Sequence, residues 1–464
     1  MKKKYKSIAA DYIAENSKPV LEVVRRMWAE PETAWNEVKA AQWNAELMKS
    51  SGFKVETGYL GIPTAVRAVW GKGHPVIGIL GELDALPALS QKVSTRQEEA
   101  KPGAPGQGCG HNLLAGACLA AAIGLKEEMK ARKLPGTVVF YGCPAEEVLT
   151  GKPFMARAGA FKELDVAFSW HGSTYNEVTL GTMTGLNSAV FHFKGRTAHA
   201  GGAPQDGRSA LDAVELMNVG ANYLREHVTD DVRIHYVIQN GGAAPNIVPG
   251  DASVWYYVRA LSRGAVEETY DRLVKVARGA AMMTETEVSV EFLGGCYNTL
   301  ENSVLVDLVH ETMEALPMPK WTKRELDFAE EMNKVSPVYE KLRRAGALDG
   351  APIADFVSPI GHENGFGSTD VGDVQHIVPG VQVNTATHNI AAPGHSWQLT
   401  ACSGHSIGEK GMLYGAQIMA AAAVRLIEEP ALLEKARAEF DARTKAEPYV
   451  CPIGPDLPVP QPKK

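Results

Sequence analysis

Val76-Ile77-Gly78-Ile79-Leu80-Gly81-Glu82-Leu83-Asp84-Ala85-Leu86-Pro87 joins a short β-branched run to an acidic turn. Residues 76–80 predict a strand, because the run is short, apolar and bounded by proline and glycine. Glu82 and Asp84 follow at once, so two carboxylates leave the end of that strand. Polar groups in this position are typical of open α/β sheets, which bind ligands beyond the carboxyl ends of their strands.

The segments on both sides of this stretch alternate between strand-like and helix-like patterns. Upstream, residues 64–69 predict another strand, and apolar residues between about 5 and 51 recur at near-helical spacing, which predicts a pair of helices interrupted by Pro31. Downstream, the pattern predicts helices at 113–130 and 154–161 and strands at 137–141 and 166–170. This alternation indicates an α/β fold with a mainly parallel sheet.

The order of predicted strands and helices changes between about residues 183 and 297. The pattern there predicts strands at 189–193, 233–238, 253–259 and 287–292, with helices at 209–225 and 265–282. This βαββαβ order is typical of a ferredoxin-like unit. We therefore expect a catalytic domain of residues 1–182 and 298–464, and an inserted domain of residues 183–297.

In the second half of the expected catalytic domain, the sequence pattern predicts helices at 302–315, 321–333 and 408–428 and a strand at 381–385. A proline-rich tail, predicted to be extended, follows from residue 448. At 464 residues the chain exceeds the roughly 250 to 300 at which one core stops growing, which also favours two domains.

Composition excludes several classes of protein. A charged fraction of 22% and a net charge of -7 provide no general basic surface for nucleic acid. Six scattered cysteines do not form a disulfide framework, the start does not have the form of a signal peptide, and no run is long enough to span a membrane. We expect a cytoplasmic protein that does not bind membranes.

Side chains that bind metals occur after several of the predicted strands. Cys109 and His111 stand two residues apart in Gly108-Cys109-Gly110-His111, Glu147 follows the strand at 137–141, and His171 follows the strand at 166–170. Thiolate, imidazole and carboxylate groups bind zinc and similar ions. Together with a late histidine, for which spacing alone leaves His388, His395 and His405 open, they predict a metallohydrolase.

Each of these residues also has an ordinary structural interpretation. Cys109 could be a small buried apolar residue, or a nucleophile with His111 or His171 as its base. Glu146 and Glu147 could be solvated surface acids. If Glu147 binds a metal, however, Glu146 is placed to take a proton from a water activated by that metal.

Three polar residues of the inserted segment complete the candidate set. His199 lies in the glycine-rich run of residues 195–202, Asn246 in Pro245-Asn246-Ile247-Val248-Pro249, and Arg259 at the end of a predicted strand. Arginine can bind a carboxylate through two parallel hydrogen bonds, so Arg259 is a candidate anchor for an acidic substrate end. Residues 90–107 are polar and rich in proline and glycine, which predicts a mobile loop that could gate the site.

The motifs, taken in order, resemble those of a known superfamily. Gly-Glu-Leu-Asp-Ala-Leu-Pro, Gly-Cys-Gly-His-Asn, Pro-Ala-Glu-Glu, Trp-His-Gly, Gly-Arg-Thr-Ala-His-Ala and Asn-Ile-Val-Pro-Gly are similar to those of the aminoacylase/carboxypeptidase superfamily of dinuclear metallohydrolases. They look most like its amidohydrolase branch, and the residues around Gly367-Ser368-Thr369-Asp370 and His395-Ser396-Trp397 resemble its aminobenzoyl-glutamate hydrolase subgroup.

The resemblance implies a role for each candidate residue. Two divalent ions, manganese or zinc, would be held by Cys109 as a bridge together with His111, Glu147, His171 and His395, with Glu146 as the general base. Asp84 matches an aspartate that orients a ligand. His199, Asn246 and Arg259 match substrate-binding groups, of which the histidine reaches the active site of the partner subunit.

The resemblance also implies the class of reaction and the assembly. We expect hydrolysis of the amide bond of an N-acyl amino acid, aromatic acyl groups included, with a dipeptidase or general deacylase as the alternative in the same family. The inserted domain implies a homodimer, or a pair with a homologous second subunit. A cysteine-nucleophile acyl transferase and a non-catalytic subunit are the competing classes.

Overall fold

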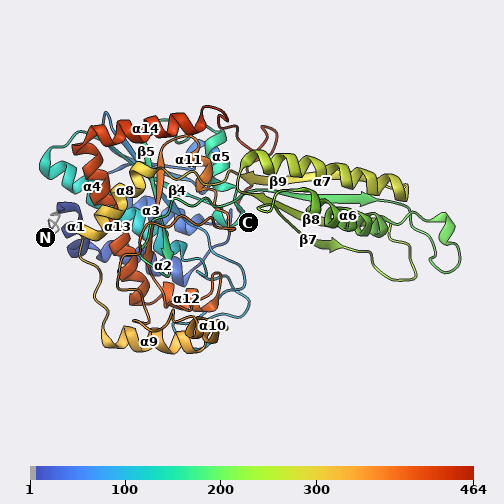
Figure 1. Cartoon of the computed structure of the whole chain (residues 1–464), viewed down its shortest axis with the longest axis horizontal. Helices are drawn as coiled ribbons and strands as arrows, with labels where there is room; N and C mark the ends of the chain where they lie inside the picture. Colours follow the sequence, from blue (N-terminus) through green and yellow to red (C-terminus); the bar gives the residue numbers. More distant parts are fainter. Residues whose placement is uncertain (1–6, 464) are drawn as a thin grey trace.

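The computed structural model describes residues 7–463, which form a broad α/β part and a projecting part (Figure 1). The α/β part contains strands β1 (Lys54–Thr57), β2 (Val66–Lys72), β3 (Val76–Glu82), β4 (Gly136–Cys143), β5 (Val166–Ser173) and β10 (Gly380–Ala386). Its helices are α1 (Ile8–Asn16), α2 (Lys18–Ala29), α3 (Val38–Ser50), α4 (His111–Arg132), α5 (Gly151–Arg157), α8 (Ser303–Ala315), α9 (Lys323–Lys334), α10 (Tyr339–Arg344), α11 (Val371–Gln375), α12 (Trp397–Ser403), α13 (Ser406–Glu428) and α14 (Pro430–Thr444).

Six strands form the main sheet in the order β1-β2-β4-β3-β5-β10. Strands β4, β3, β5 and β10 run parallel, while β1 and β2 add an antiparallel edge. The predicted mainly parallel sheet is therefore confirmed. Because the parallel strands share one direction, β3, β4, β5 and β10 all end at the same edge, where the candidate site lies.

Both faces of the central strands are covered, which explains why all seven residues of β3 are buried. Ile77 and Ile79 pack into the larger core with α1, α2, α4 and α13. Val76 and Leu80 face the other way, into a core shared with α5, α11 and the C-terminal tail. Small residues allow close packing: a side chain at Gly415 of α13 would collide with the ring of Trp170.

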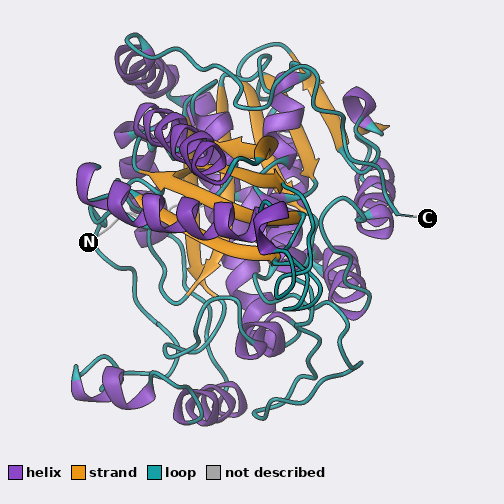
Figure 2. Cartoon of the chain, turned by 90° about the vertical axis from the view of Figure 1, so that its right-hand side faces the viewer, coloured by secondary structure: helices purple, strands orange, loops and turns teal. Residues whose placement is uncertain are grey.

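The projecting part is the predicted βαββαβ unit, made by β6 (Gly185–Lys194), α6 (Ala210–Leu224), β7 (Arg233–Asn240), β8 (Asp251–Ala260), α7 (Arg263–Thr284) and β9 (Glu287–Cys296). Its four strands are antiparallel in the order β7-β8-β6-β9. The two helices pack against each other on one face of this sheet around a core of their own (Figure 2). The predicted fold class is confirmed.

Several local predictions differ from the structure. The expected pair of N-terminal helices is three helices, because the chain breaks again at Ser17, which caps α2 before Pro19. Strand β1 and helix α14 are additional elements. All six cysteines are free, and from residue 7 to 463 no helix has the length and apolarity that a membrane span requires.

Candidate metal centre

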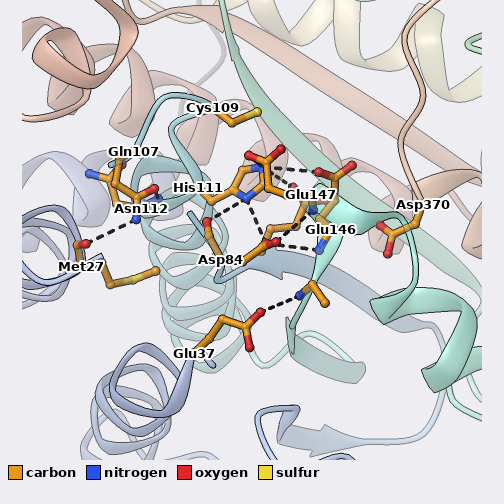
Figure 3. A network of polar contacts seen from close by, with 12 residues as sticks. Met27, Glu37, Asp84, Gln107, Cys109, His111, Asn112, Glu146, Glu147 and Asp370 are labelled. Atoms are coloured by element: carbon orange, nitrogen blue, oxygen red, sulfur yellow. Dashed lines mark hydrogen bonds and ion pairs between the residues drawn. The ribbon is translucent and has the colours of Figure 1, made fainter. Parts of the chain in front are cut away.

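The candidate metal ligands predicted from four separate segments lie together at the carboxyl edge of the main sheet. Figure 3 shows three of them, Cys109, His111 and Glu147, beside Asp84 and Glu146. Three sets of donor atoms lie close enough to hold an ion: Cys109, His111 and His171; Cys109, Glu147 and His395; and Glu82, His111 and Glu146. Cys109 and His111 occur in the first set and link it to the other two. The structure thus gathers all five predicted ligands, with the carboxyl groups of Glu82 and Glu146 beside them.

The two imidazoles nearest the sheet are fixed by hydrogen bonds from their Nδ1 atoms. His111 Nδ1 lies 3.0 Å from the Asp84 carbonyl oxygen and 3.1 Å from its Oδ1, and His171 Nδ1 lies 2.7 Å from the Gly172 carbonyl oxygen. A proton on Nδ1 leaves Nε2 as the free ligand atom, an arrangement common in metal sites. Burial lowers the pKa of His171, with a further contribution from His111, which keeps the ring neutral.

A tight turn after β4 presents the two glutamates. Glu146–Val148 is one 3-10 turn (η2), and the residues on either side of it, Ala145 and Leu149, adopt left-handed backbone conformations with φ of 54° and 56°. The Asp84 carboxylate accepts the backbone N–H groups of Glu146 and Glu147, at 3.2 and 2.9 Å. Asp84 therefore holds both the His111 ring and the turn that carries Glu146 and Glu147 through hydrogen bonds.

Cys109 and His395 complete the site on its more open side. The Cys109 sulfur lies 3.3 Å from His171 Nε2, and His395 Nε2 lies 3.8 Å from Glu147 Oε2. The His395 side chain is 59% exposed, whereas that of His111 is fully buried. His395 also has a left-handed backbone, with φ of 49°.

These separations fit divalent ions. Two ligands at about 2.0 to 2.3 Å from a tetrahedral ion lie about 3.3 to 3.8 Å from each other. His111 Nε2 and Glu147 Oε1 are buried and make no hydrogen bond in the structure. Buried polar atoms normally have hydrogen-bond partners. Two buried atoms without one, in a cluster of sulfur, nitrogen and oxygen donors, indicate a cation site.

The charge of the site supports the same conclusion. Carboxylates crowd around one buried ammonium, that of Lys152, which lies 2.6 Å from Glu82 Oε1 and 2.5 Å from Asp370 Oδ1. Burial alone would lower the pKa of Lys152, but Asp370 and Glu82 raise it well above its usual value, so this side chain is charged. The carboxyl groups of Glu82, Asp84, Glu146, Glu147 and Asp370 outnumber this one ammonium, and divalent ions would supply the further positive charge that their ionised forms need.

Burial also sets the protonation of the acidic donors. It raises the pKa of Glu147 to about 7, and that of the Cys109 thiol to about 12. For Glu146, burial and the nearby Glu82 raise the pKa well above the usual range. A divalent ion would stabilise the deprotonated forms that ligands must adopt.

The chain is similar in sequence to several known hydrolases. It is 38% identical, over 96% of its length, to a subunit of the p-aminobenzoyl-glutamate hydrolase of Escherichia coli, and it covers 96% of that subunit. It is 30% identical to the Xaa-Arg dipeptidase of Mus musculus, with 95% and 93% of the two chains covered. Residues 182–282 match the family model of a peptidase dimerisation domain.

The chain belongs to the M20 family of metal-dependent hydrolases. The resemblance inferred from its motifs is confirmed, and so is its assignment as an enzyme. A dinuclear metal-binding peptidase of the M20 family from Bacillus subtilis has the same fold, with a TM-score of 0.59 and 17% identity over 89% of this chain and 98% of that one. An aminobenzoyl-glutamate utilization protein from Klebsiella pneumoniae also has this fold, with a TM-score of 0.61 and 18% identity over 89% and 97%.

The other two late histidines of this M20 chain belong to no donor set, although His388 lines the same cavity as the cluster. His388 is buried beside Thr174, its Nε2 3.3 Å from that hydroxyl, and burial lowers its pKa to about 3. His405 caps the start of α13 and stacks on Phe328. Of the three late histidines, only His395 belongs to a donor set.

Substrate-binding candidates divide into two groups. Arg259 lines the same cavity as Glu146 and Glu147, which has a volume of about 500 Å³. By contrast, His199 and Asn246 are exposed, on the loops that follow β6 and β7. These loops lie at the end of the projecting part that points away from the α/β part (Figure 1). Within one M20 chain, these two residues do not meet the metal cluster.

The loop of residues 90–107 is folded and lies to one side. Lys92 and Ser90 form backbone hydrogen bonds to Glu98 and Ala104, and Gln91 is buried. Among the described residues that line the cavity, none comes from this loop. Its position beside α2, where it shares a surface groove with Trp28 and Glu30, does not support a gate over the cavity.

Proposed function

We propose that this M20 hydrolase cleaves the amide bond between an acyl group and an amino acid, using two divalent ions, manganese or zinc. The observation that carries the proposal is the position of Glu146, which belongs to a donor cluster and opens onto the same cavity as an unpaired arginine. When bound, the ions would polarise the scissile carbonyl and lower the pKa of water. Cys109, His111, Glu147, His171 and His395 would hold them.

Glu146 supplies the proton transfers in this proposal. Its carboxylate takes a proton from the attacking water and returns it to the nitrogen of the leaving amino acid as the amide bond breaks. Burial and the surrounding carboxylates raise its proton affinity, which suits a base that must also act as an acid. Asp84 acts through His111 and the turn, and it does not face the cavity.

Arg259 is suited to bind the carboxylate of the amino-acid portion. Its Nε atom is buried without a hydrogen-bond partner, its Nη1 donates to Ser368 Oγ at 3.2 Å, and no acidic side chain pairs with it among the described residues. A buried guanidinium of this kind favours an anionic ligand. Leu149, Met183 and Tyr257 add apolar lining to the cavity, which favours an aromatic or other apolar acyl group.

A dipeptidase is the second candidate, because one relative is named for that activity. We expect the metal-loaded protein to hydrolyse at least one N-acyl amino acid or dipeptide, p-aminobenzoyl-glutamate included, and to lose turnover when a chelator removes the ions. Product amine is measured before chelation, after it, and after re-addition of Mn²⁺ or Zn²⁺. Activity that survives complete ion removal would favour the cysteine-nucleophile mechanism instead.

We also propose a dimer in which the projecting part of one chain completes the site of the other. Strand β7 forms one edge of the four-stranded sheet, and Tyr236, Val237 and Ile238 on it are exposed. An apolar edge strand of this kind is a pairing surface. His199 and Asn246 lie too far out to serve their own chain, which supports a role toward a partner subunit.

Coexpression of two inactive variants tests this arrangement. If the partner supplies His199, chains carrying His199→Ala and chains carrying Glu146→Gln form mixed dimers with one intact site. Random pairing then restores about a quarter of native activity. A His192→Ala variant, changed at an exposed histidine of the same domain, is the control and should stay active. No recovery in purified mixed dimers would contradict the proposal.

A further inference from the structure

Glu82 lies deep inside the metal centre, although none of the roles described above uses it. It is the last residue of β3 and is only 3% exposed. Its Oε2 atom lies 3.2 Å from His111 Nε2, closer than Glu146 Oε2 at 3.7 Å or Glu147 Oε1 at 3.9 Å. Among the carboxylates around that nitrogen, Glu82 is therefore the nearest.

The two oxygens of Glu82 have different partners. Oε1 is occupied by the Lys152 ammonium at 2.6 Å, and Lys152 in turn is held by Asp370, which also accepts its backbone N–H at 2.8 Å. Lys152 and Asp370 are both fully buried. This arrangement leaves Oε2 as the oxygen that faces His111.

The nitrogen that Oε2 faces is itself without a hydrogen bond. His111 Nε2 is buried and makes no hydrogen bond, its nearest carboxylate oxygen being Glu82 Oε2 at 3.2 Å, while Nδ1 of the same ring is held by Asp84. An oxygen and a nitrogen about 3.3 Å apart have the separation of two ligands on one tetrahedral ion. A second carboxylate, Glu146, reaches the same point.

We propose that Glu82 is a further protein ligand of the metal centre, at its deeper position. This inference rests on the dinuclear site of the proposed function and adds a residue to it. The deeper position would then be built from carboxylate oxygen and imidazole nitrogen, with Glu82 and His111 as its fixed members. The shallower position would keep Cys109, Glu147 and His395, so the two ions would differ in their ligand chemistry.

This difference has a consequence for metal choice. Carboxylate ligands suit manganese and other hard cations, whereas thiolate suits zinc. The deeper position should therefore bind Mn²⁺ better, relative to Zn²⁺, than the position that contains the cysteine sulfur.

Ion binding by a Glu82→Gln variant tests the proposal without an activity assay. Metal-free native protein and the variant are titrated with Mn²⁺ in a calorimeter, and bound ions are counted by elemental analysis. We expect native protein to bind two ions, and Glu82→Gln to bind one of them at least about tenfold more weakly while the other is unchanged. Glu301→Gln is the matched control, since Glu301 is also buried but pairs with Gln375 outside the donor sets.

The outcomes separate the inference from the function on which it rests. Native binding of two ions with unchanged affinities in Glu82→Gln would overturn the role of Glu82 and leave the proposed function standing. Failure of the native protein to bind any divalent ion would overturn both. If the variant does not fold, anomalous diffraction from Zn²⁺-loaded native crystals decides: Glu82 Oε2 should lie about 2.0 to 2.2 Å from one ion, and a larger separation from both ions would overturn the inference.

Discussion

Replacing Glu146 with glutamine is expected to lower kcat by about 10²- to 10⁴-fold while both ions stay bound. Glutamine keeps the size of the side chain but cannot accept and return a proton. The loss should fall on kcat with little change in KM, because the proposed substrate contacts, Arg259 and the apolar lining, are unchanged in this variant. Steady-state kinetics and elemental analysis of the same preparation measure the two effects together.

The neighbouring residue supplies the contrast for this variant. Glu147→Gln should lose ion affinity and activity together, since Glu147 belongs to the donor set with Cys109 and His395. Glu146 also lies within reach of an ion, beside Glu82 and His111. Loss of an ion from Glu146→Gln would show that Glu146 is a ligand, and another group would then have to serve as the base.

Replacing Cys109 with serine is expected to weaken ion binding by at least about 100-fold and to abolish turnover. The sulfur belongs to two of the three donor sets, with His111 and His171 in one and with Glu147 and His395 in the other, so its loss removes a donor from both sets. A serine hydroxyl ionises far less readily than a thiol and is a poor replacement for a thiolate ligand. Calorimetric titration with Zn²⁺ and an activity assay at saturating ion measure the change.

The cysteine experiment also separates two classes of enzyme. Cys451→Ser is the matched control, because Cys451 is likewise a half-buried free thiol but lies on the C-terminal tail. It should bind ions and turn over substrate like native protein. A Cys109→Ser variant that loses turnover but keeps both ions at native affinity would identify Cys109 as a nucleophile.

Much of the site follows from local sequence because parallel strands bring distant segments to one edge. Glu146, Glu147 and His171 each stand at or just after the end of a strand, so an apolar run followed by a polar group was enough to find them. The same pattern did not distinguish His395 from His388 and His405, because all three histidines lie in the same late segment of the sequence. Their separation from the donor sets depends on tertiary packing against Thr174 and Phe328.

Lys152 and Asp370 could not have been found in the same way. They are 218 residues apart, and Gly151-Lys152-Pro153 has the pattern of an ordinary helix start. Of the residues in this buried charge cluster, only Glu82 stood out in the sequence, because it follows a predicted strand and precedes Asp84. Local sequence patterns also do not predict how far His199 and Asn246 lie from the metal cluster of their own chain. That distance depends on the length of the projecting sheet.

The left-handed backbones at Ala145, Leu149 and His395 bear on how long the protein survives in a cell. Such conformations cost non-glycine residues roughly 1 to 3 kcal/mol each. Here two of them lie within two residues of Glu147, and the third is at His395, which is itself a proposed ligand. Ions that bind the folded chain and not the unfolded one would offset this cost. We therefore expect proteases to cut these loops faster in the metal-free protein than in the metal-loaded protein.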